Sequence, residues 1–260
     1  MKKRILAVFL AVAALACSLS ACGGATTQTT TPSDETTPSS GAPHANELTV
    51  GIAQDLDDSL DPYKMTAAGT REVMFNVFEG LVKPDSSGNY VNAVASDVSV
   101  SEDGLTYVFT LRDNVVFHNG AVCTPDDVLY SFETCAATSV TSAVVEALSA
   151  IAETSVNGNE ITMVLSAPNS DFLSYVASVY IVPAGYTDQT TQPVGTGPFK
   201  FVSRSVQENI ILEKHEEYYG EPAHLDKVTY KIYEDGTALF TALDSGAQDL
   251  VAHPTIHQVN

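Results

Sequence analysis

An abrupt change of composition near residue 47 does most to limit what this chain can fold into. Residues 23–46 are mainly Thr, Ser, Pro and Gly, with hardly an apolar side chain among them. Such a segment cannot bury enough apolar surface to offset the entropy lost on folding, so we predict that residues 22–46 form a disordered tether. A folded body must therefore come from the residues that follow, where apolar side chains recur at regular spacing.

Residues 1–21 have the layout of a secretory signal peptide. Three basic residues precede an apolar run over residues 5–19, which is shorter than the roughly 20 residues needed to span a bilayer. Small residues then lead to Cys22, a pattern that resembles the cleavage and acylation site of bacterial lipoproteins. We predict that residues 1–21 are removed and that Cys22 carries the lipid. An ordinary signal peptide with a chance cysteine is the alternative.

The charge balance narrows the range of partners. Lys and Arg number 12 against 32 Asp and Glu, which gives a formal net charge of −20. An acidic surface repels both the phosphates of nucleic acids and anionic lipid headgroups. We therefore expect no nucleic-acid partner, and membrane contact only through the N-terminal lipid.

Hydrophobic periodicity after residue 47 predicts strands interleaved with helices. Leu48, Val50 and Ile52 alternate as in a strand, and glycine-containing turns at 102–104 and 157–159 indicate two hairpins. Thr124 and Pro125 mark a helix start. Strands are predicted at 105–111, 161–165, 180–182, 198–204, 207–214, 228–233 and 249–252, and helices at 67–80, 125–134, 142–153, 171–178 and from 237. The class is α/β, or mixed α+β.

Two cysteines, Cys123 and Cys135, fall within the folded part. The residues between them are predicted to be helical, which separates the sulfurs by roughly 15 Å at 1.5 Å per residue. A disulfide needs Cα atoms roughly 6 Å apart. We predict that both thiols are free.

The motifs of common hydrolases do not occur in this sequence. It contains no G-x-S-x-G, S-x-x-K, H-E-x-x-H or C-x-x-C pattern, so a secreted hydrolase is disfavoured and we predict that the protein is not an enzyme. His118 is expected to satisfy turn backbone rather than act as a base. The segment from His215 to His224 could hold a metal, but a solvated loop with packed tyrosine rings is favoured.

Gly195 and Gly197 lie in a glycine-rich segment that superficially resembles a phosphate-binding loop. Pro198 leads into a predicted strand, whereas a phosphate-binding loop leads into a helix. We expect these glycines to allow a sharp turn or a close backbone approach where two parts of the fold meet.

Six short segments, taken in order, resemble the extracellular solute-binding proteins of family 5, the oligopeptide, dipeptide and nickel binders of ATP-driven importers. They are SLDP at 59–62, FEGLV at 78–82, SEDGLTYVFTLRDNVVFHNG at 101–120 with TPDDV at 124–128, PVGTGPFKF at 193–201, EEYYGEPAHLDKVTYKIYED at 216–235 and ALDSGAQDL at 242–250. The chain departs from the family at Val98 and Tyr219, where tryptophan is usual, so some aromatic packing is expected to be lost.

The resemblance implies a periplasmic-binding-protein-like type II fold, in which a ligand is enclosed between two lobes. It implies that residues 47–65 and 190–252 form the sheet-rich part of the first lobe and that residues 66–189 form an inserted α/β subdomain. Residues 253–260 would be the end of a truncated chain near the hinge, with the second lobe missing. An isolated lobe should bind ligand weakly or not at all, because half of the cleft wall is absent.

The resemblance also supplies candidate site residues and partners. The segment after Leu-Asp-Pro maps the cleft wall to Thr66, Ala68 and Gly69, and the region before the last helix maps it to Asp235 and Thr237. It implies a monomeric lipoprotein on the outer face of the bacterial cell membrane, which captures peptides or a related small solute for the permease subunits of an importer. No cofactor is implied. The alternative is a degenerate surface lipoprotein with an interaction or signalling role and no transport.

Overall fold

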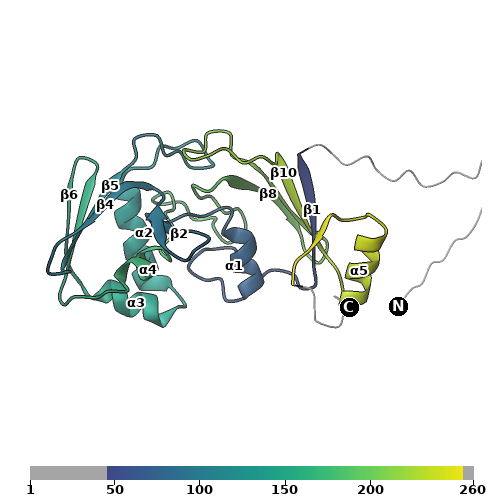
Figure 1. Cartoon of the computed structure of the whole chain (residues 1–260), viewed down its shortest axis with the longest axis horizontal. Helices are drawn as coiled ribbons and strands as arrows, with labels where there is room; N and C mark the ends of the chain where they lie inside the picture. Colours follow the sequence, from purple (N-terminus) through teal and green to yellow (C-terminus); the bar gives the residue numbers. More distant parts are fainter. Residues whose placement is uncertain (1–45, 254–260) are drawn as a thin grey trace, which may run out of the picture. The chain divides into compact units, whose positions relative to one another are not determined.

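The computed structural model describes residues 46–253 (Figure 1). The predicted signal peptide, Cys22 and nearly all of the predicted tether lie outside the described residues. The strands are β1 (Glu47–Ile52), β2 (Val82–Pro84), β3 (Tyr90–Asn92), β4 (Ala95–Val100), β5 (Thr106–Leu111), β6 (Ile151–Asn157), β7 (Glu160–Leu165), β8 (Phe199–Ser205), β9 (Asn209–Lys214), β10 (Lys227–Ile232) and β11 (Leu250–Val251). The helices are α1 (Ala68–Met74), α2 (Pro125–Thr138), α3 (Ser142–Ser149), α4 (Phe172–Val176) and α5 (Gly236–Asp244). The predicted mixed α/β class is confirmed.

A five-stranded sheet joins the two ends of the described chain. Its strand order is β11-β1-β10-β9-β8. β1 runs parallel to both of its neighbours, with Val50 opposite Tyr230 on β10 and opposite Leu250 on β11. Helices α1 and α5 lie on opposite sides of this sheet in Figure 1. The first strand of the fold is therefore held in place by strands that follow it by well over a hundred residues.

A second sheet is four-stranded and antiparallel, in the order β4-β5-β7-β6. One of its two inner strands, β5, buries Tyr107, Phe109 and Leu111, the face predicted from their alternation, and α2, α3 and α4 lie beside this sheet (Figure 1). Both predicted hairpins are present, and their glycines, Gly104 and Gly158, have φ angles of 70° and 59°. A side chain is strained in this left-handed region, which is why glycine occurs at these turns.

Helix α2 begins where the sequence predicts. Pro125 occupies its first position, and Thr124 and Asp127 form a capping box in which the Thr124 amide donates to Asp127 Oδ2 at 2.8 Å. The helix continues to Thr138, past the predicted end at residue 134. Cys123 and Cys135 are both free, as predicted, and both are buried.

Three predicted elements differ from the structure. Helix α1 ends at Met74 instead of residue 80, because the carbonyl groups of Asn76 and Val77 accept from the amides of Phe199 and Gly197. The predicted helix 142–153 stops at Ser149, and the residues after it join β6, where pairing with β7 outweighs helix propensity. Residues 180–182 form no strand, since their amides find only isolated partners, such as the carbonyl of Glu79 for Ile181.

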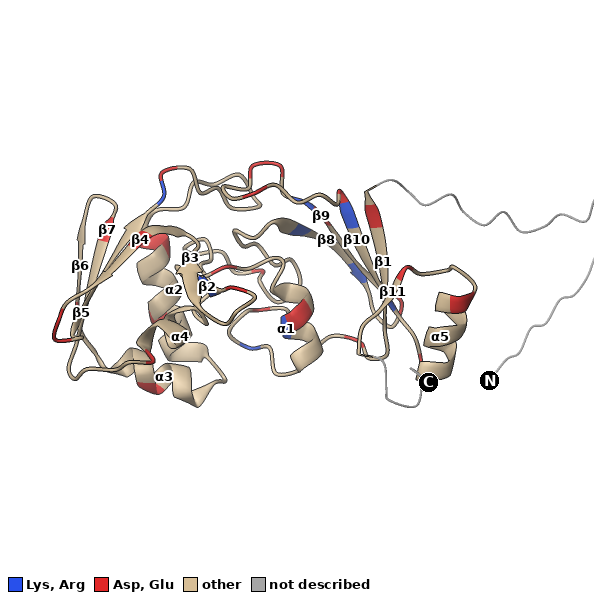
Figure 2. Ribbon diagram, viewed as in Figure 1, with Lys and Arg blue, Asp and Glu red and all other residues tan. Residues whose placement is uncertain are grey.

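The described residues fall within a single compact unit. A continuous cluster of buried apolar side chains runs from Val50 and Val228 in one sheet to Phe109 and Ile161 in the other. The division into a sheet-rich lobe and an inserted subdomain therefore stays a prediction. Acidic residues are spread over loops, strands and helices rather than gathered in one place (Figure 2). None of the helices in this part of the chain has the length and hydropathy needed to cross a membrane.

Candidate functional site

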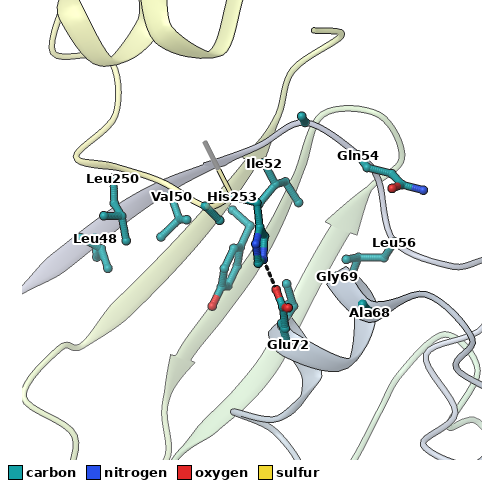
Figure 3. Close-up of a pocket in the computed structure, with 14 residues that line it drawn as sticks. Leu48, Val50, Ile52, Gln54, Leu56, Ala68, Gly69, Glu72, Leu250 and His253 are labelled. Carbon is teal, nitrogen blue, oxygen red and sulfur yellow. Dashed lines mark hydrogen bonds and ion pairs between the residues drawn. The ribbon is translucent and has the colours of Figure 1, made fainter. Parts of the chain in front are cut away.

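A pocket of about 540 Å³ lies between the five-stranded sheet and helix α1 (Figure 3). Its walls come from β1 and the residues just after it, from the start and middle of α1, and from β10 and β11. The lining residues are Leu48, Val50, Ile52, Ala53, Gln54, Leu56, Ala68, Gly69, Glu72, Val73, Tyr230, Leu250, Ala252 and His253. Most of these side chains are apolar, so the pocket can accept an apolar group without leaving polar atoms unpaired.

The alternation of β1 creates the apolar wall. Leu48, Val50 and Ile52 point to the same face of the sheet because side chains two residues apart share a face. Parallel pairing with β11 places Leu250 on this wall as well, and the Leu250 side chain is 50% exposed. A continuous apolar surface is thus left partly open beside α1.

A carboxylate and an imidazole meet at the pocket. Glu72 from α1 and His253, the last described residue, make a contact between Glu72 Oε2 and His253 Nε2 (Figure 3). Both side chains remain largely exposed, at 52% and 72%. Burial, and then the charge of Glu72, raise the pKa of Tyr230, so this phenol stays neutral. Glu72 therefore carries the only carboxylate among the described residues that line the pocket.

The turn before α1 is held by a carboxylate. Asp57 Oδ2 accepts from the amides of Thr66 and Ala67 at 2.7 and 2.8 Å, and Asp57 Oδ1 accepts from the Thr66 hydroxyl at 3.1 Å. Although desolvation opposes it, these hydrogen bonds keep the pKa of Asp57 below its ordinary value. From β8, Arg204 donates to the carbonyl groups of Leu56 and Asp57. The pocket edge is thus fixed before any ligand arrives.

The structure brings together only part of the predicted ligand-contacting set. Ala68 and Gly69 line the pocket, and Thr66 lies just outside it, bound to Asp57. Asp235 caps helix α5, where its carboxylate accepts from the Thr237 and Ala238 amides at 2.8 and 2.9 Å. Neither Asp235 nor Thr237 lines the pocket, and a role for any of the five in binding stays a prediction.

Sequence reasoning missed Glu72 and the contribution of β11. Glu72 occurs in a helix predicted only from its apolar side, and nothing local marks its carboxylate as lying beside a pocket. Leu250 was predicted to be in a strand, but its neighbour β1 cannot be read from spacing. The signal that could have indicated the pocket is the alternation of Leu48, Val50 and Ile52, since three apolar residues on one face need a cover.

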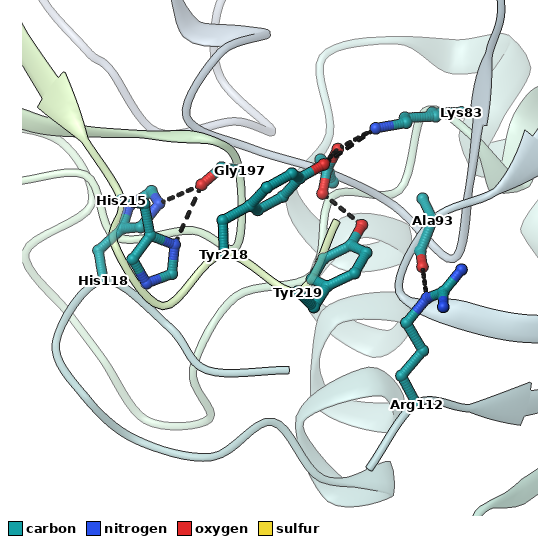
Figure 4. A network of polar contacts seen from close by, with 9 residues as sticks. Lys83, Ala93, Arg112, His118, Gly197, His215, Tyr218 and Tyr219 are labelled. Atoms are coloured by element: carbon teal, nitrogen blue, oxygen red, sulfur yellow. Dashed lines mark hydrogen bonds and ion pairs between the residues drawn. The ribbon is translucent and has the colours of Figure 1, made fainter. Parts of the chain in front are cut away.

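A second polar site surrounds the turn at residues 195–197 (Figure 4). His118 Nδ1 accepts from the Gly195 amide at 3.3 Å, while His118 Nε2 and His215 Nδ1 both donate to the Gly197 carbonyl, at 3.0 and 3.2 Å. Burial lowers the pKa of His118 to about 4 and also lowers the pKa of His215. We call these four residues the histidine clamp. As predicted, His118 satisfies backbone, although the backbone is that of the glycine turn.

The glycines of the clamp permit a close approach of two chain segments. A Cβ on Gly197 would lie 2.5 Å from the Asn76 carbonyl oxygen, and one on Gly195 would lie 2.3 Å from that of Val77. The turn also leads directly into β8. It therefore joins the five-stranded sheet to the segment after α1, which agrees with the close approach expected from the sequence.

A buried carboxylate lies near the clamp. Glu79 is 5% exposed and accepts from the hydroxyls of Tyr218 and Tyr219 and from Lys83 Nζ (Figure 4). Although burial opposes it, the Glu79 charge raises the pKa of Lys83. Arg112 lies over the Tyr219 ring at 5.2 Å. We call Glu79, Lys83, Tyr218 and Tyr219 the glutamate cluster.

The glutamate cluster adds to one prediction from the sequence. Most of the segment from His215 to His224 is exposed and its tyrosine rings pack, as predicted. The burial of His215, which is 6% exposed, and the bonds of the two tyrosine hydroxyls to Glu79 were not predicted; a buried carboxylate needs several donors. His224, at the other end of the segment, is exposed.

Nucleophile and metal chemistry find little support in the described part of the chain. Burial raises the pKa of Cys123 to about 12 and that of Cys135 to about 11, so neither is a thiolate at neutral pH. Within residues 46–253 no three His, Cys, Asp or Glu side chains are grouped as metal ligands would be.

Comparison with known families identifies one match. Residues 89–260 match the model of the bacterial extracellular solute-binding proteins, family 5 (middle). The matched region contains the histidine clamp, β3 to β11 and the C-terminal wall of the pocket.

Individual relatives agree with this match. The chain is 27% identical to the nickel-binding periplasmic protein of Escherichia coli over 67% of its own length and 35% of that protein. It is 28% identical to the glutathione-binding protein GsiB of Pectobacterium atrosepticum over 72% and 38% of the two lengths. Among solved structures, the periplasmic binding protein DppA of Helicobacter pylori in complex with the peptide STSA superposes with a TM-score of 0.74 at 28% identity, covering 82% of this chain and 48% of that one. The chain thus spans less than half the length of these relatives.

Proposed function

Because this chain belongs to the bacterial extracellular solute-binding proteins of family 5, we propose that it captures a peptide or related small solute for an ATP-driven importer. The observation that carries the proposal is the pocket beside α1. It is concave and apolar, its edge is held by Asp57 and Arg204, and two of the residues expected at the cleft wall, Ala68 and Gly69, line it. We assign this pocket to one wall of the ligand cleft.

The physical logic of capture follows from the pocket. An apolar wall gains free energy by removing ligand surface from water, at roughly 25 cal/mol per Å² of buried apolar area. Because the Asp57 hydrogen bonds already order the edge of the wall, little entropy is lost there on binding. A second wall that closes over the ligand would exclude water, and the closed form could then be selected by a permease.

The location is part of the same proposal. We propose that the signal at residues 1–21 exports the chain, that Cys22 is acylated, and that residues 22–46 let the folded part range from the outer face of the membrane. The excess of acidic residues, 32 against 12 basic ones in the full sequence, supports attachment through the lipid rather than through surface contact. Metabolic labelling with a fatty acid should mark the wild type and leave Cys22→Ser unlabelled.

Isothermal titration calorimetry of the full-length protein tests solute capture. The titrants are dipeptides, oligopeptides, reduced glutathione and nickel complexes, and we expect heat of binding from at least one of these classes. Flat traces for every titrant would count against capture and would favour the interaction role.

A matched pair of variants then tests the pocket. Gly69→Leu projects a side chain into open space at the pocket wall, where a Cβ meets nothing within 4 Å. Binding should weaken about tenfold or more, the effect of losing about 1.4 kcal/mol. Thr138→Leu adds the same side chain at an exposed position of α2 and should bind as wild type. Equal ligand affinities of the two variants would show that this pocket is not part of the ligand cleft.

A further inference from the structure

The pocket combines a broad apolar surface with a single carboxylate, that of Glu72, among the described residues that line it. Leu48, Val50, Ile52 and Leu250 supply adjoining aliphatic surface from β1 and β11. Across from them, on α1, stands Glu72 (Figure 3). A ligand that buries an aliphatic group against the sheet would thus carry its other end toward a carboxylate.

The charges around the pocket favour a positively charged group at the end of the ligand that lies near Glu72. No Lys or Arg occurs among the described residues that line the pocket. Arg71, next to Glu72 in sequence, donates to the Met65 carbonyl at 3.1 Å and lines a different recess. A ligand carboxylate would therefore meet the like charge of Glu72 with no Lys or Arg on the described lining to compensate, whereas an ammonium would meet an opposite charge.

The Glu72 carboxylate already contacts a nitrogen donor in the structure. His253 Nε2 contacts Glu72 Oε2, and both side chains remain largely exposed. The imidazole thus marks where a nitrogen cation fits beside the apolar wall. Because the contact is exposed, it is weak, and a ligand cation can replace it at little cost.

From this arrangement we infer that Glu72 is a specificity-determining residue: the pocket takes a ligand in which a branched aliphatic group is joined to a primary ammonium, and Glu72 binds the ammonium in place of His253. This inference rests on the proposed function, because it treats the pocket as a ligand-binding wall. It adds to the proposed function the charge and the shape of the part of the ligand that contacts this wall.

Three probes of equal shape test the inference. They are 3-methylbutylamine, 3-methylbutanol and 3-methylbutanoate, which are cationic, neutral and anionic at neutral pH. Amide chemical shifts of β1 and α1 are followed by NMR while each probe is added at millimolar concentration. We expect the amine to bind about two- to fivefold tighter than the alcohol, the range expected for an exposed ion pair, and the carboxylate to bind most weakly.

Three variants locate the effect. Glu72→Gln should bring the amine to the affinity of the alcohol, while His253→Gln should bind the amine more tightly because the competing imidazole is gone. Glu133→Gln removes an exposed carboxylate from α2, away from the pocket, and should behave as wild type. This control separates the effect of Glu72 from that of net charge.

Each outcome of these measurements either supports or overturns the inference. Loss of the amine preference in Glu72→Gln alone supports the inference. If all three probes bind equally, or if the preference survives in Glu72→Gln, the inference is overturned while the pocket remains a binding wall. If no probe shifts the β1 and α1 resonances, the inference fails together with the assignment of this pocket in the proposed function.

Discussion

Two glutamates seven positions apart, Glu72 and Glu79, experience opposite surroundings. Glu79 is 5% exposed and accepts from two tyrosine hydroxyls and a lysine, whereas Glu72 is 52% exposed and contacts only His253 through its side chain. The histidines differ in the same way, since both ring nitrogens of His118 are bound by backbone of the glycine turn and His253 is 72% exposed. A polar group whose bonds are completed by the chain stabilises the fold, and one left open beside an apolar wall is free for a ligand.

This contrast also explains why the two sites lie where they do. The histidine clamp and the glutamate cluster join the segment after α1 to the turn before β8 and to the loop after β9. There, unpaired polar atoms would cost about 1–3 kcal/mol each. The pocket is lined by α1, β1, β10 and β11, and there solvent can still reach Glu72, which is 52% exposed. The structural polar sites and the candidate binding site thus use different residues.

The largest expected effect comes from adding one methyl group to the clamp. In Gly197→Ala the new Cβ would overlap the backbone of Asn76 and Val77, which cannot move without disrupting α1 and β8. We expect a loss of about 4 kcal/mol or more in the free energy of unfolding, or failure to fold, measured by urea denaturation.

Gly69→Ala is the matched control on the pocket side. Its Cβ meets nothing within 4 Å and it replaces a helical glycine, so stability should rise by about 0.5–1 kcal/mol. Similar losses in both variants would contradict the contrast between the two sites.

The second effect is a pH dependence carried by His118. Its pKa is about 4 in the folded protein against an ordinary value of 6.5, so the unfolded chain binds the extra proton between these pH values. Stability from this group is fully present above about pH 6.5 and is lost as the pH falls toward 4. The loss is on the order of 3 kcal/mol.

Urea denaturation at a series of pH values measures this loss. Because carboxylates also titrate in acid, the quantity compared is the difference between wild type and His118→Gln. That difference should shrink as the pH is lowered, while His224→Gln, at an exposed histidine, should follow the wild-type profile throughout. A constant difference across the range would show that His118 does not titrate as the clamp geometry requires.

The smallest expected effect is the difference in unfolding free energy lost when each of the two glutamates is replaced by alanine. Glu79→Ala leaves two tyrosine hydroxyls and Lys83 without their partner, and we expect it to cost about 2 kcal/mol of unfolding free energy. Glu72→Ala should cost less than about 0.5 kcal/mol because its contact is exposed. Equal costs, measured by thermal or urea unfolding, would place Glu72 in the structural group and weaken its assignment to ligand recognition.

Much of the fold could be predicted from local patterns. The alternation of Leu48, Val50 and Ile52 predicted β1, and the glycines at 104 and 158 predicted the hairpins that build the four-stranded sheet. Thr124 and Pro125 predicted the start of α2 to the residue. These succeeded because capping, turn chemistry and strand alternation depend on neighbours only a few positions away.

The failures occurred where distant segments compete for the same backbone groups. Helix α1 was predicted too long because the amides of Gly197 and Phe199 take the carbonyls that a longer helix would use. The loop after His215 is largely exposed, as predicted, but the bonds of Tyr218 and Tyr219 to Glu79 were not predicted, because Glu79 lies far away in sequence. Of the candidate site residues, Ala68 and Gly69 lie at the pocket, while Asp235 caps a helix.

The sequence by itself determined the alternating faces, the caps, the turns, the free cysteines and the resemblance of six ordered segments to one family. Only the tertiary structure decided that β1 lies between β10 and β11, with Thr49 and Asp249 bonded across 200 positions, and so created the pocket. It also decided that Glu79 is buried and Glu72 is open. The reason is physical: a residue's local pattern depends on its near neighbours, whereas its burial and its bonding partners depend on whichever distant segment packs against it.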